Sequence, residues 1–138
     1  MIRNIVFILA CLVTLNVQAV KRPNIVLLFA DDLGYGDLGK WLINDHIEAV
    51  KYLGNFSYAD TGRVGVWGWS GGGYFTALAL TKGADYFTTG VSIAPVTDWR
   101  LYDTAYTERY MGLLSENEAG YDTASVLTYI DQFKGKLL

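Results

Sequence analysis

Residues 64–73 read V-G-V-W-G-W-S-G-G-G, and this stretch decides the fold. An apolar run leads into a Gly-x-Ser-x-Gly sequence centred on Ser70, and the helix-compatible residues 74–80 follow. A strand, a sharp turn and a helix in this order are typical of a nucleophile elbow, in which glycines leave room for a tight, strained turn. We expect the turn to hold the Ser70 hydroxyl at the end of a sheet, beside the N–H groups that open the helix. A plain glycine-rich turn is the alternative.

Apolar periodicity extends this pattern along the chain and predicts strands alternating with helices. Gly54, Gly83 and Gly112 stand where helix C-caps are expected. Alternation of this kind favours an α/β fold with a parallel sheet, here thin and incomplete. The elements expected are strands over 24–30, 63–69 and 88–94, helices over 42–53, 72–82 and 104–112, and a weaker helix over 123–134.

Four segments carry a family resemblance: residues 45–49 (D-H-I-E-A), the elbow, residues 94–99 (A-P-V-T-D-W) and residues 102–112 (Y-D-T-A-Y-T-E-R-Y-M-G). From about residue 38 to 138 the chain resembles the catalytic domain of the prolyl oligopeptidase family of serine peptidases, in its dipeptidyl peptidase IV branch. The resemblance implies an α/β-hydrolase fold, a peptide substrate, Ser70 as the nucleophile and the Gly71 N–H as oxyanion donor, with no cofactor. Gly71 departs from that branch, which has a tyrosine after the nucleophile.

Three tyrosines, Tyr102, Tyr106 and Tyr110, recur every four residues and predict one face of a helix. Spacing alone favours packing as their role. The family resemblance implies a role in substrate binding, because in the dipeptidyl peptidase IV branch the matching positions line the pocket that accepts proline. Flat apolar walls suit a ring without an N–H group. The pocket residues implied are Val96, Trp99, Tyr102 and Tyr106.

The catalytic triad is incomplete in these 138 residues. In this fold the triad runs serine, then aspartate or glutamate, then histidine, whereas the single histidine, His46, precedes Ser70. His46 lies beside an apolar stripe formed by Ile43, Ile47 and Val50, which predicts a helix-surface position. Without a histidine base a serine hydroxyl stays protonated and is a poor nucleophile. We therefore expect little or no peptidase activity from this polypeptide.

The first 19 residues have the pattern of a secretory signal peptide. Arg3 precedes an apolar run over 5–15, and V-Q-A follows at 17–19, with small residues at its first and last positions. The run is too short to span a membrane. An uncleaved anchor is the alternative, and a lipoprotein attached at Cys11 is a weaker one, because little hydrophobic core precedes that cysteine. The sequence thus predicts a secreted or periplasmic protein with no membrane span after cleavage.

Residues 21–39 resemble the opening segment of a sulfatase. The buried-strand pattern over 25–30 ends at Asp31 and Asp32, which that resemblance implies are metal ligands. Two carboxylates suit calcium, but they leave most of its coordination shell to water, so weak binding is expected. A polar turn after a strand is the alternative. The Cys/Ser-x-Pro-x-Arg sequence that a sulfatase nucleophile needs is absent from these 138 residues.

Three domains follow: a signal peptide over 1–19, a sulfatase-like strand and Asp-Asp turn over 20–39, and a partial hydrolase domain over 40–138. The net charge of −3 and the lack of a basic run give no reason to expect a nucleic-acid partner. The oligomeric state is open. Three functions remain: a serine peptidase by ancestry, a sulfatase-like metal-dependent ester hydrolase, or a non-catalytic fusion remnant.

Overall fold

The computed structural model describes residues 41–138, with strands and helices alternating as the sequence predicts. The predicted signal peptide, the strand over 24–30 and the Asp31-Asp32 turn lie outside the described residues. The elements are α2 (Trp41–Leu53), β1 (Gly65–Trp69), α3 (Gly71–Leu80), β2 (Thr89–Ile93), η1 (Trp99–Leu101), α4 (Thr104–Met111), α5 (Glu118–Ala124), η2 (Val126–Gln132) and β3 (Lys136–Leu137). The expected α/β fold is confirmed.

The described strands form one parallel sheet in the order β1-β2-β3. Trp67 pairs with Val91 and Trp69 with Ile93, so β1 and β2 end at the same edge. Along β1 burial alternates, with Val66 and Gly68 buried and their neighbours exposed. One face of the sheet therefore carries the core.

Helix α3 is the centre of that core, because all its residues from Gly72 to Leu80 are buried. It packs against both β1 and β2. Three glycines at its start are poor helix formers, so burial against the strands, rather than intrinsic propensity, stabilises this helix.

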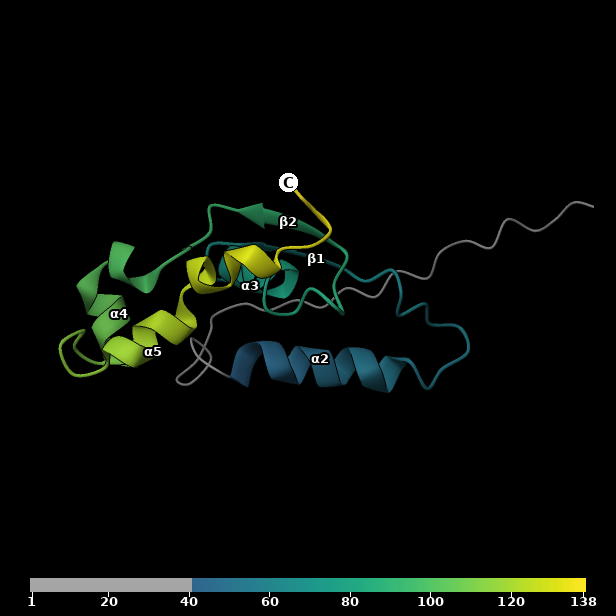
Figure 1. Ribbon diagram of the computed structural model, residues 1–138, viewed down its shortest axis with the longest axis horizontal. Helices are drawn as coiled ribbons and strands as arrows, with labels where there is room; N and C mark the ends of the chain where they lie inside the picture. The colour runs from purple at the N-terminus through teal and green to yellow at the C-terminus, as the bar shows by residue number, and fades with distance from the viewer. Residues whose placement is uncertain (1–40) are drawn as a thin grey trace, which may run out of the picture.

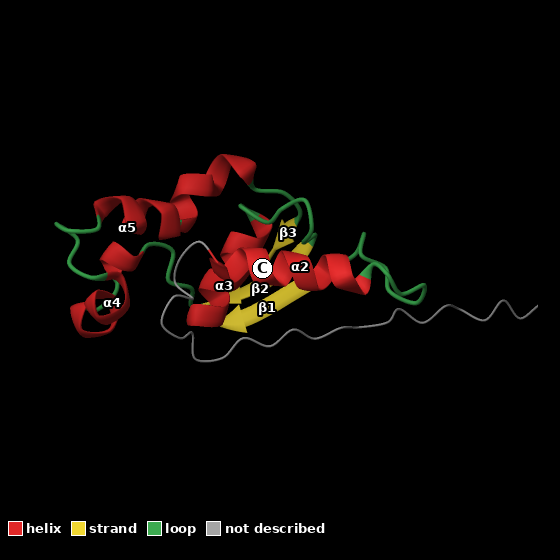
Figure 2. Cartoon of the chain, turned by 90° about the horizontal axis from the view of Figure 1, so that it is seen from below, coloured by secondary structure: helices red, strands yellow, loops and turns green. Residues whose placement is uncertain are grey.

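Helix α2 lies on the same side of the sheet as α3 and packs against it (Figures 1 and 2). Its predicted apolar stripe is confirmed: Ile43 and Val50 are buried and Ile47 packs against the core. Gly54 follows the helix directly, and its N–H donates to the Val50 carbonyl at 3.1 Å. The C-cap expected at Gly54 is thus found.

After β2, the short helices η1, α4 and α5 lie beyond the carboxyl ends of the strands (Figure 1), whereas η2 packs back against α3 and β3 joins the sheet. Gly112 ends α4 as expected, with a positive φ of 74°. The single helix expected over 123–134 is wrong. Ser125 is extended and its hydroxyl accepts the Leu127 N–H, so α5 ends and η2 begins around it.

Two further expectations about helix ends need correction. Helix α3 ends at Leu80 with Thr81 as its C-cap, so Gly83 lies beyond the cap. The Thr81 hydroxyl donates to the Ala77 carbonyl at 2.8 Å, and the Gly83 N–H donates to the Leu78 carbonyl at 3.1 Å, so Gly83 contributes to the helix end without being its cap residue. Tyr102 precedes α4, because the Asp103 side chain accepts the Tyr106 N–H and begins that helix. Only Tyr106 and Tyr110 therefore share the helix.

Candidate active site

Ser70 occupies the turn between β1 and α3 with φ 52° and ψ −110°. Its N–H donates to the Ile93 carbonyl at 2.9 Å, and its own carbonyl accepts the Tyr74 N–H at 2.9 Å. A residue other than glycine in such a region is strained by about 1–3 kcal/mol and persists only when its surroundings hold it. The strand on one side and the helix on the other hold Ser70 in this way.

Ala94 carries a second strained backbone, with φ 44°, immediately after β2. Because Trp69 and Ile93 are partners in the sheet, the strained residues Ser70 and Ala94 follow paired positions at the same edge. Strain of this kind clusters at functional sites. The carboxyl edge of β1 and β2 is therefore the place in the described fold where a functional site is expected.

The tightness of the elbow explains its glycines. A Cβ atom added at Gly68 would lie 2.3 Å from the carbonyl carbon of Gly72, a backbone atom that cannot move aside. Helix α3 begins at Gly71, so the Gly71 N–H lies in the first helical turn, where no preceding helical carbonyl accepts it. This position suits a donor to a developing oxyanion.

Three of the four expected pocket residues, the aromatic ones, are in mutual contact. Trp99 is buried, and its ring stacks on Tyr106 with the ring centroids 5.9 Å apart. Tyr102 meets Trp99 edge-on at 6.0 Å and Tyr106 at 5.5 Å. Tyr102 remains 43% exposed, and Val96 packs at the margin of the core. The structure thus brings the three aromatic residues into one cluster.

Tyr74 is the residue that sequence reasoning missed. It lies one helical turn after Ser70, and its ring is 5.1 Å from that of Trp99. Its hydroxyl donates to the Ala124 carbonyl at 2.9 Å. Burial raises the pKa of Tyr74 well above its ordinary value, so the donor proton is retained. Tyr74 thus links the elbow helix to the aromatic cluster. A tyrosine within an otherwise apolar helix was the available signal.

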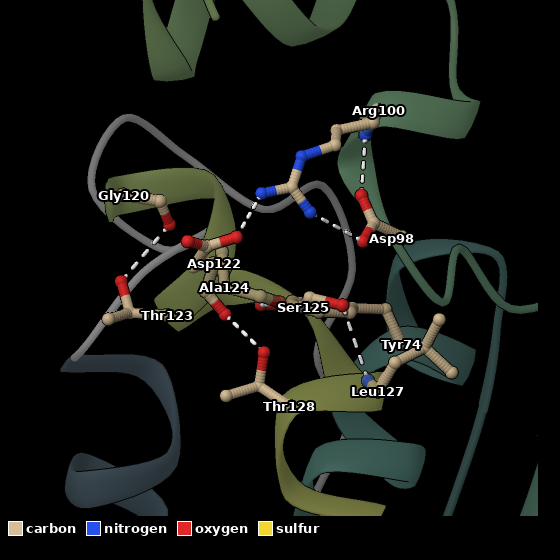
Figure 3. Close-up of polar contacts among 10 residues, drawn as sticks. All are labelled: Tyr74, Asp98, Arg100, Gly120, Asp122, Thr123, Ala124, Ser125, Leu127 and Thr128. Carbon is tan, nitrogen blue, oxygen red and sulfur yellow. Dashed lines mark hydrogen bonds and ion pairs between the residues drawn. The ribbon is translucent and has the colours of Figure 1, made fainter. Parts of the chain in front are cut away.

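A polar network holds the segment that carries Trp99 (Figure 3). Asp98 accepts the Arg100 N–H at 2.9 Å and the Arg100 guanidinium at 3.0 Å, and Arg100 also pairs with Asp122 of α5. Burial of Asp98 opposes its charge, but hydrogen bonds from Arg100 and Ser125 and the Arg100 charge outweigh burial and lower the pKa of Asp98. Trp99 is thus flanked on both sides by anchored residues.

His46 lies on α2, away from the hydroxyl it would have to activate. Its ring packs on Phe75 with the centroids 4.1 Å apart, and its Nδ1 is 2.8 Å from the Leu42 carbonyl. It is half-buried rather than fully on the helix surface. In residues 41–138 no hydrogen bond joins His46 to Ser70, so the described structure offers Ser70 no histidine base.

The predicted metal ligands Asp31 and Asp32 lie outside the described residues. Among residues 41–138 no group of three or more histidine, cysteine, aspartate or glutamate side chains could hold a metal ion. A search of the same part of the chain for a helix able to cross a membrane found none.

The sequence of the chain matches a known protein family. The model of the prolyl oligopeptidase family matches residues 29–138. The chain belongs to the prolyl oligopeptidase family. The match begins nine residues before residue 38 and so includes part of the segment that resembles a sulfatase.

Individual relatives agree with this membership. The chain is 49% identical over 89 residues to "Probable dipeptidyl peptidase 4" of Aspergillus flavus, covering 64% of the chain and 12% of that protein. It is 46% identical over 100 residues to "Probable dipeptidyl-aminopeptidase B" of Coccidioides posadasii, covering 70% of the chain and 11% of that protein. The chain therefore spans only a small part of the length of these relatives.

A solved structure also matches. The dipeptidyl peptidase 4 of Porphyromonas gingivalis superposes with a TM-score of 0.66 at 44% identity, covering 69% of this chain and 14% of that one. Fold and sequence thus point to the same family.

Proposed function

We propose that this chain carries the nucleophile-bearing part of a serine peptidase, with Ser70 as the nucleophile and the Gly71 N–H as oxyanion donor. The observation that carries the proposal is the strained backbone of Ser70 between β1 and α3. The names of the relatives support a peptide as the substrate class. On this proposal Val96, Trp99, Tyr102 and Tyr106 contact the residue that precedes the cleaved bond.

We propose further that the 138-residue chain by itself does not turn over peptides. Attack by Ser70 needs a base to accept the hydroxyl proton while the Oγ–carbon bond forms. No histidine follows Ser70 in these 138 residues, and His46 packs on Phe75. In subtilisin, loss of the serine or histidine of the triad lowers kcat by about a millionfold. An export signal at the N-terminus, as the sequence predicts, would place the chain outside the cytoplasm.

A sulfatase-like function has weaker support. It rests on Asp31 and Asp32, which lie outside the described residues, and no described contact favours it. A non-catalytic role is compatible with the missing base. In the first proposal Ser70 is positioned for attack, whereas in a non-catalytic role it is an ordinary serine.

Chemical rescue distinguishes an organised elbow from an ordinary exposed serine. Imidazole added to the purified protein can act as the missing base, and a fluorophosphonate probe reports the reactive serine. We expect little labelling without imidazole and labelling of Ser70 that rises with imidazole concentration, since general-base catalysis contributes about 10²–10⁴ in rate.

Two variants make this experiment decisive. Ser70→Ala should abolish the imidazole-dependent labelling, whereas Ser115→Ala, in an exposed turn between α4 and α5, should leave it unchanged. Equal labelling of Ser70 and Ser115 in protein that melts cooperatively would contradict an organised nucleophile. Strong labelling of Ser70 without imidazole would contradict the missing base.

A further inference from the structure

The loop between α2 and β1 contains the sequence N-F-S at residues 55–57, in which an asparagine stands two residues before a serine. It is the single Asn-x-Ser or Asn-x-Thr sequence in these 138 residues. Such a sequence, with any residue but proline in the middle, is the acceptor for N-linked glycans and lies on surface loops of secreted proteins. Because so short a sequence also arises by chance, its place in the fold decides whether it is suited to carry a glycan.

The asparagine and the serine of this sequence lie at the surface. Asn55 and Ser57 are exposed, whereas Phe56 between them is half-buried. The Asn55 N–H donates to the Tyr52 carbonyl at 3.1 Å, and the Asn55 side-chain Nδ2 donates to the same carbonyl at 2.9 Å. The loop backbone is thus held to the end of α2 while the asparagine amide remains at an exposed position.

The loop lies at the end of the sheet opposite the candidate active site. It leads into β1, whereas Ser70 follows the other end of that strand. Figures 1 and 2 both show the loop beyond the end of α2, on the far side of the molecule from α4 and α5. A sugar attached to Asn55 would therefore begin at the amino ends of the strands, away from Ser70, and the inference does not depend on the proposed function.

Aromatic side chains surround the acceptor. Tyr52, three residues before Asn55, is 63% exposed, and its ring meets Phe56 edge-on with the centroids 5.4 Å apart. Tyr58 stacks on Phe56 at 5.4 Å and is itself 62% exposed. The first sugar of an N-linked glycan has a face of C–H groups, and packing this face on an exposed ring removes apolar surface from water.

We propose that Asn55 is an N-glycosylation site used when the chain is exported, and that the first sugar packs on Tyr52. The donor is an oligosaccharide linked to a membrane lipid through a diphosphate. The Asn55 Nδ2 forms a bond to the anomeric carbon of the first sugar. The bond from that carbon to the diphosphate oxygen breaks, and its electron pair leaves with the lipid diphosphate. The amide loses one proton and keeps one N–H, and the Ser57 hydroxyl completes the acceptor sequence.

Cell-free translation of the full chain with endoplasmic-reticulum microsomes tests the site. Translocated chains are protected from added protease, and a glycan slows their migration until peptide N-glycosidase removes it. We expect the protected chain to carry one glycan, and protected chain without a glycan would overturn the proposal. Should the native N-terminus fail to direct translocation, a known secretory leader fused before Met1 provides protected chain for the same comparison.

Substitutions locate the glycan. Asn55→Gln and Ser57→Ala should each abolish the migration shift, whereas Ser57→Thr should retain it because threonine also completes the acceptor sequence. Asn44→Gln is the matched control, since Asn44 is also exposed but is followed two residues later by His46. Its glycosylation should equal that of the unaltered chain. A shift that survives Asn55→Gln, or one that is lost in Asn44→Gln, would overturn the proposal.

Nuclear magnetic resonance of the glycosylated protein tests the contact with Tyr52. Sugar protons above an aromatic ring resonate upfield of their position in a free glycan. We expect such a shift for the first sugar and its loss in Tyr52→Ala, whereas Tyr102→Ala, beyond the other end of the strands, should leave it unchanged. Unshifted sugar signals, or a shift that persists in Tyr52→Ala, would overturn the contact.

Discussion

At the scale of single residues, the elbow combines a strained backbone at Ser70 with glycines that allow the close approach of its two elements. Ser70 has φ 52°, and the glycines beside it allow β1 and α3 to approach closely. The strain costs stability and is maintained by the bond from the Ser70 N–H to the Ile93 carbonyl. The strained turn places the half-buried Ser70 at the end of the sheet, the arrangement found in nucleophile elbows.

Gly68→Ala tests the fit of this turn. The added Cβ would lie 2.3 Å from a backbone carbon of Gly72, so the elbow would have to open. We expect the free energy of unfolding to fall by about 1–3 kcal/mol in urea denaturation. Gly65→Ala is the control on the same strand, because its nearest atom is 3.7 Å away, and it should be tolerated. Equal effects of the two variants would contradict a tight fit at Gly68.

At the scale of elements, a helix boundary is decided by the side chains that bond to it. Asp98 begins η1, and Asp103 begins α4 by accepting the Tyr106 N–H at 2.8 Å. Arg100 then connects η1 to α5 through Asp122. These bonds orient the short helices that present Trp99 and Tyr106 beside the elbow.

Asp98→Asn tests this network through its pH dependence. The pKa of Asp98 is lowered in the folded protein, so its contribution to stability is present above its unfolded pKa of about 3.9 and is lost as pH falls through the folded value. Urea denaturation at several pH values should show a less stable variant at pH 7, by about 1 kcal/mol or more. Its stability should also fall less steeply than that of the unaltered protein below about pH 4.

Asp60→Asn is the matched control for this measurement. The Arg63 hydrogen bond also lowers the pKa of Asp60, but both side chains are well exposed to solvent, where ion pairs contribute little. Its pH profile should follow that of the unaltered protein. Identical profiles for Asp98→Asn and the unaltered protein would show that the network is not important for stability.

At the scale of the whole described fold, one buried hydroxyl connects the two halves. Tyr74 on α3 and Ala124 on α5 are 50 residues apart in sequence, and the bond between them is buried. The Lys134 N–H, after η2, also donates to the Leu80 carbonyl of α3 at 3.0 Å. The cluster of short helices is thus attached to the sheet layer next to the elbow.

Tyr74→Phe removes this connection without removing the ring. The Ala124 carbonyl loses its buried donor, and we expect the free energy of unfolding to fall by about 1–3 kcal/mol. Tyr129→Phe is the control, since its hydroxyl donates to the Thr123 carbonyl at an exposed site, and it should change stability by less than about 0.5 kcal/mol. Thermal and urea unfolding measure both, and a larger effect at Tyr129 would contradict the importance of the buried link.

Local sequence patterns were sufficient to predict much of the structure of this protein. The Gly-x-Ser-x-Gly sequence between apolar and helical runs predicted the strand, the turn at Ser70 and the helix, because tight turns depend on which residues fit them. The motifs around Trp99 and Tyr106 predicted the family. The apolar stripe of Ile43 and Val50 predicted which face of α2 is buried.

Other features depended on contacts between distant segments. Side-chain oxygens that accept backbone N–H groups break the helix at Ser125 and leave Tyr102 outside α4. The apolar periodicity of the sequence does not reveal such hydrogen bonds. Tyr74 was missed because its hydroxyl finds a partner only when α5 packs against α3. The sequence by itself determined the elbow and the order of α2, β1, α3 and β2. Tertiary structure decided what holds the aromatic cluster against α3, since the Tyr74 hydroxyl reaches the Ala124 carbonyl only in the folded chain.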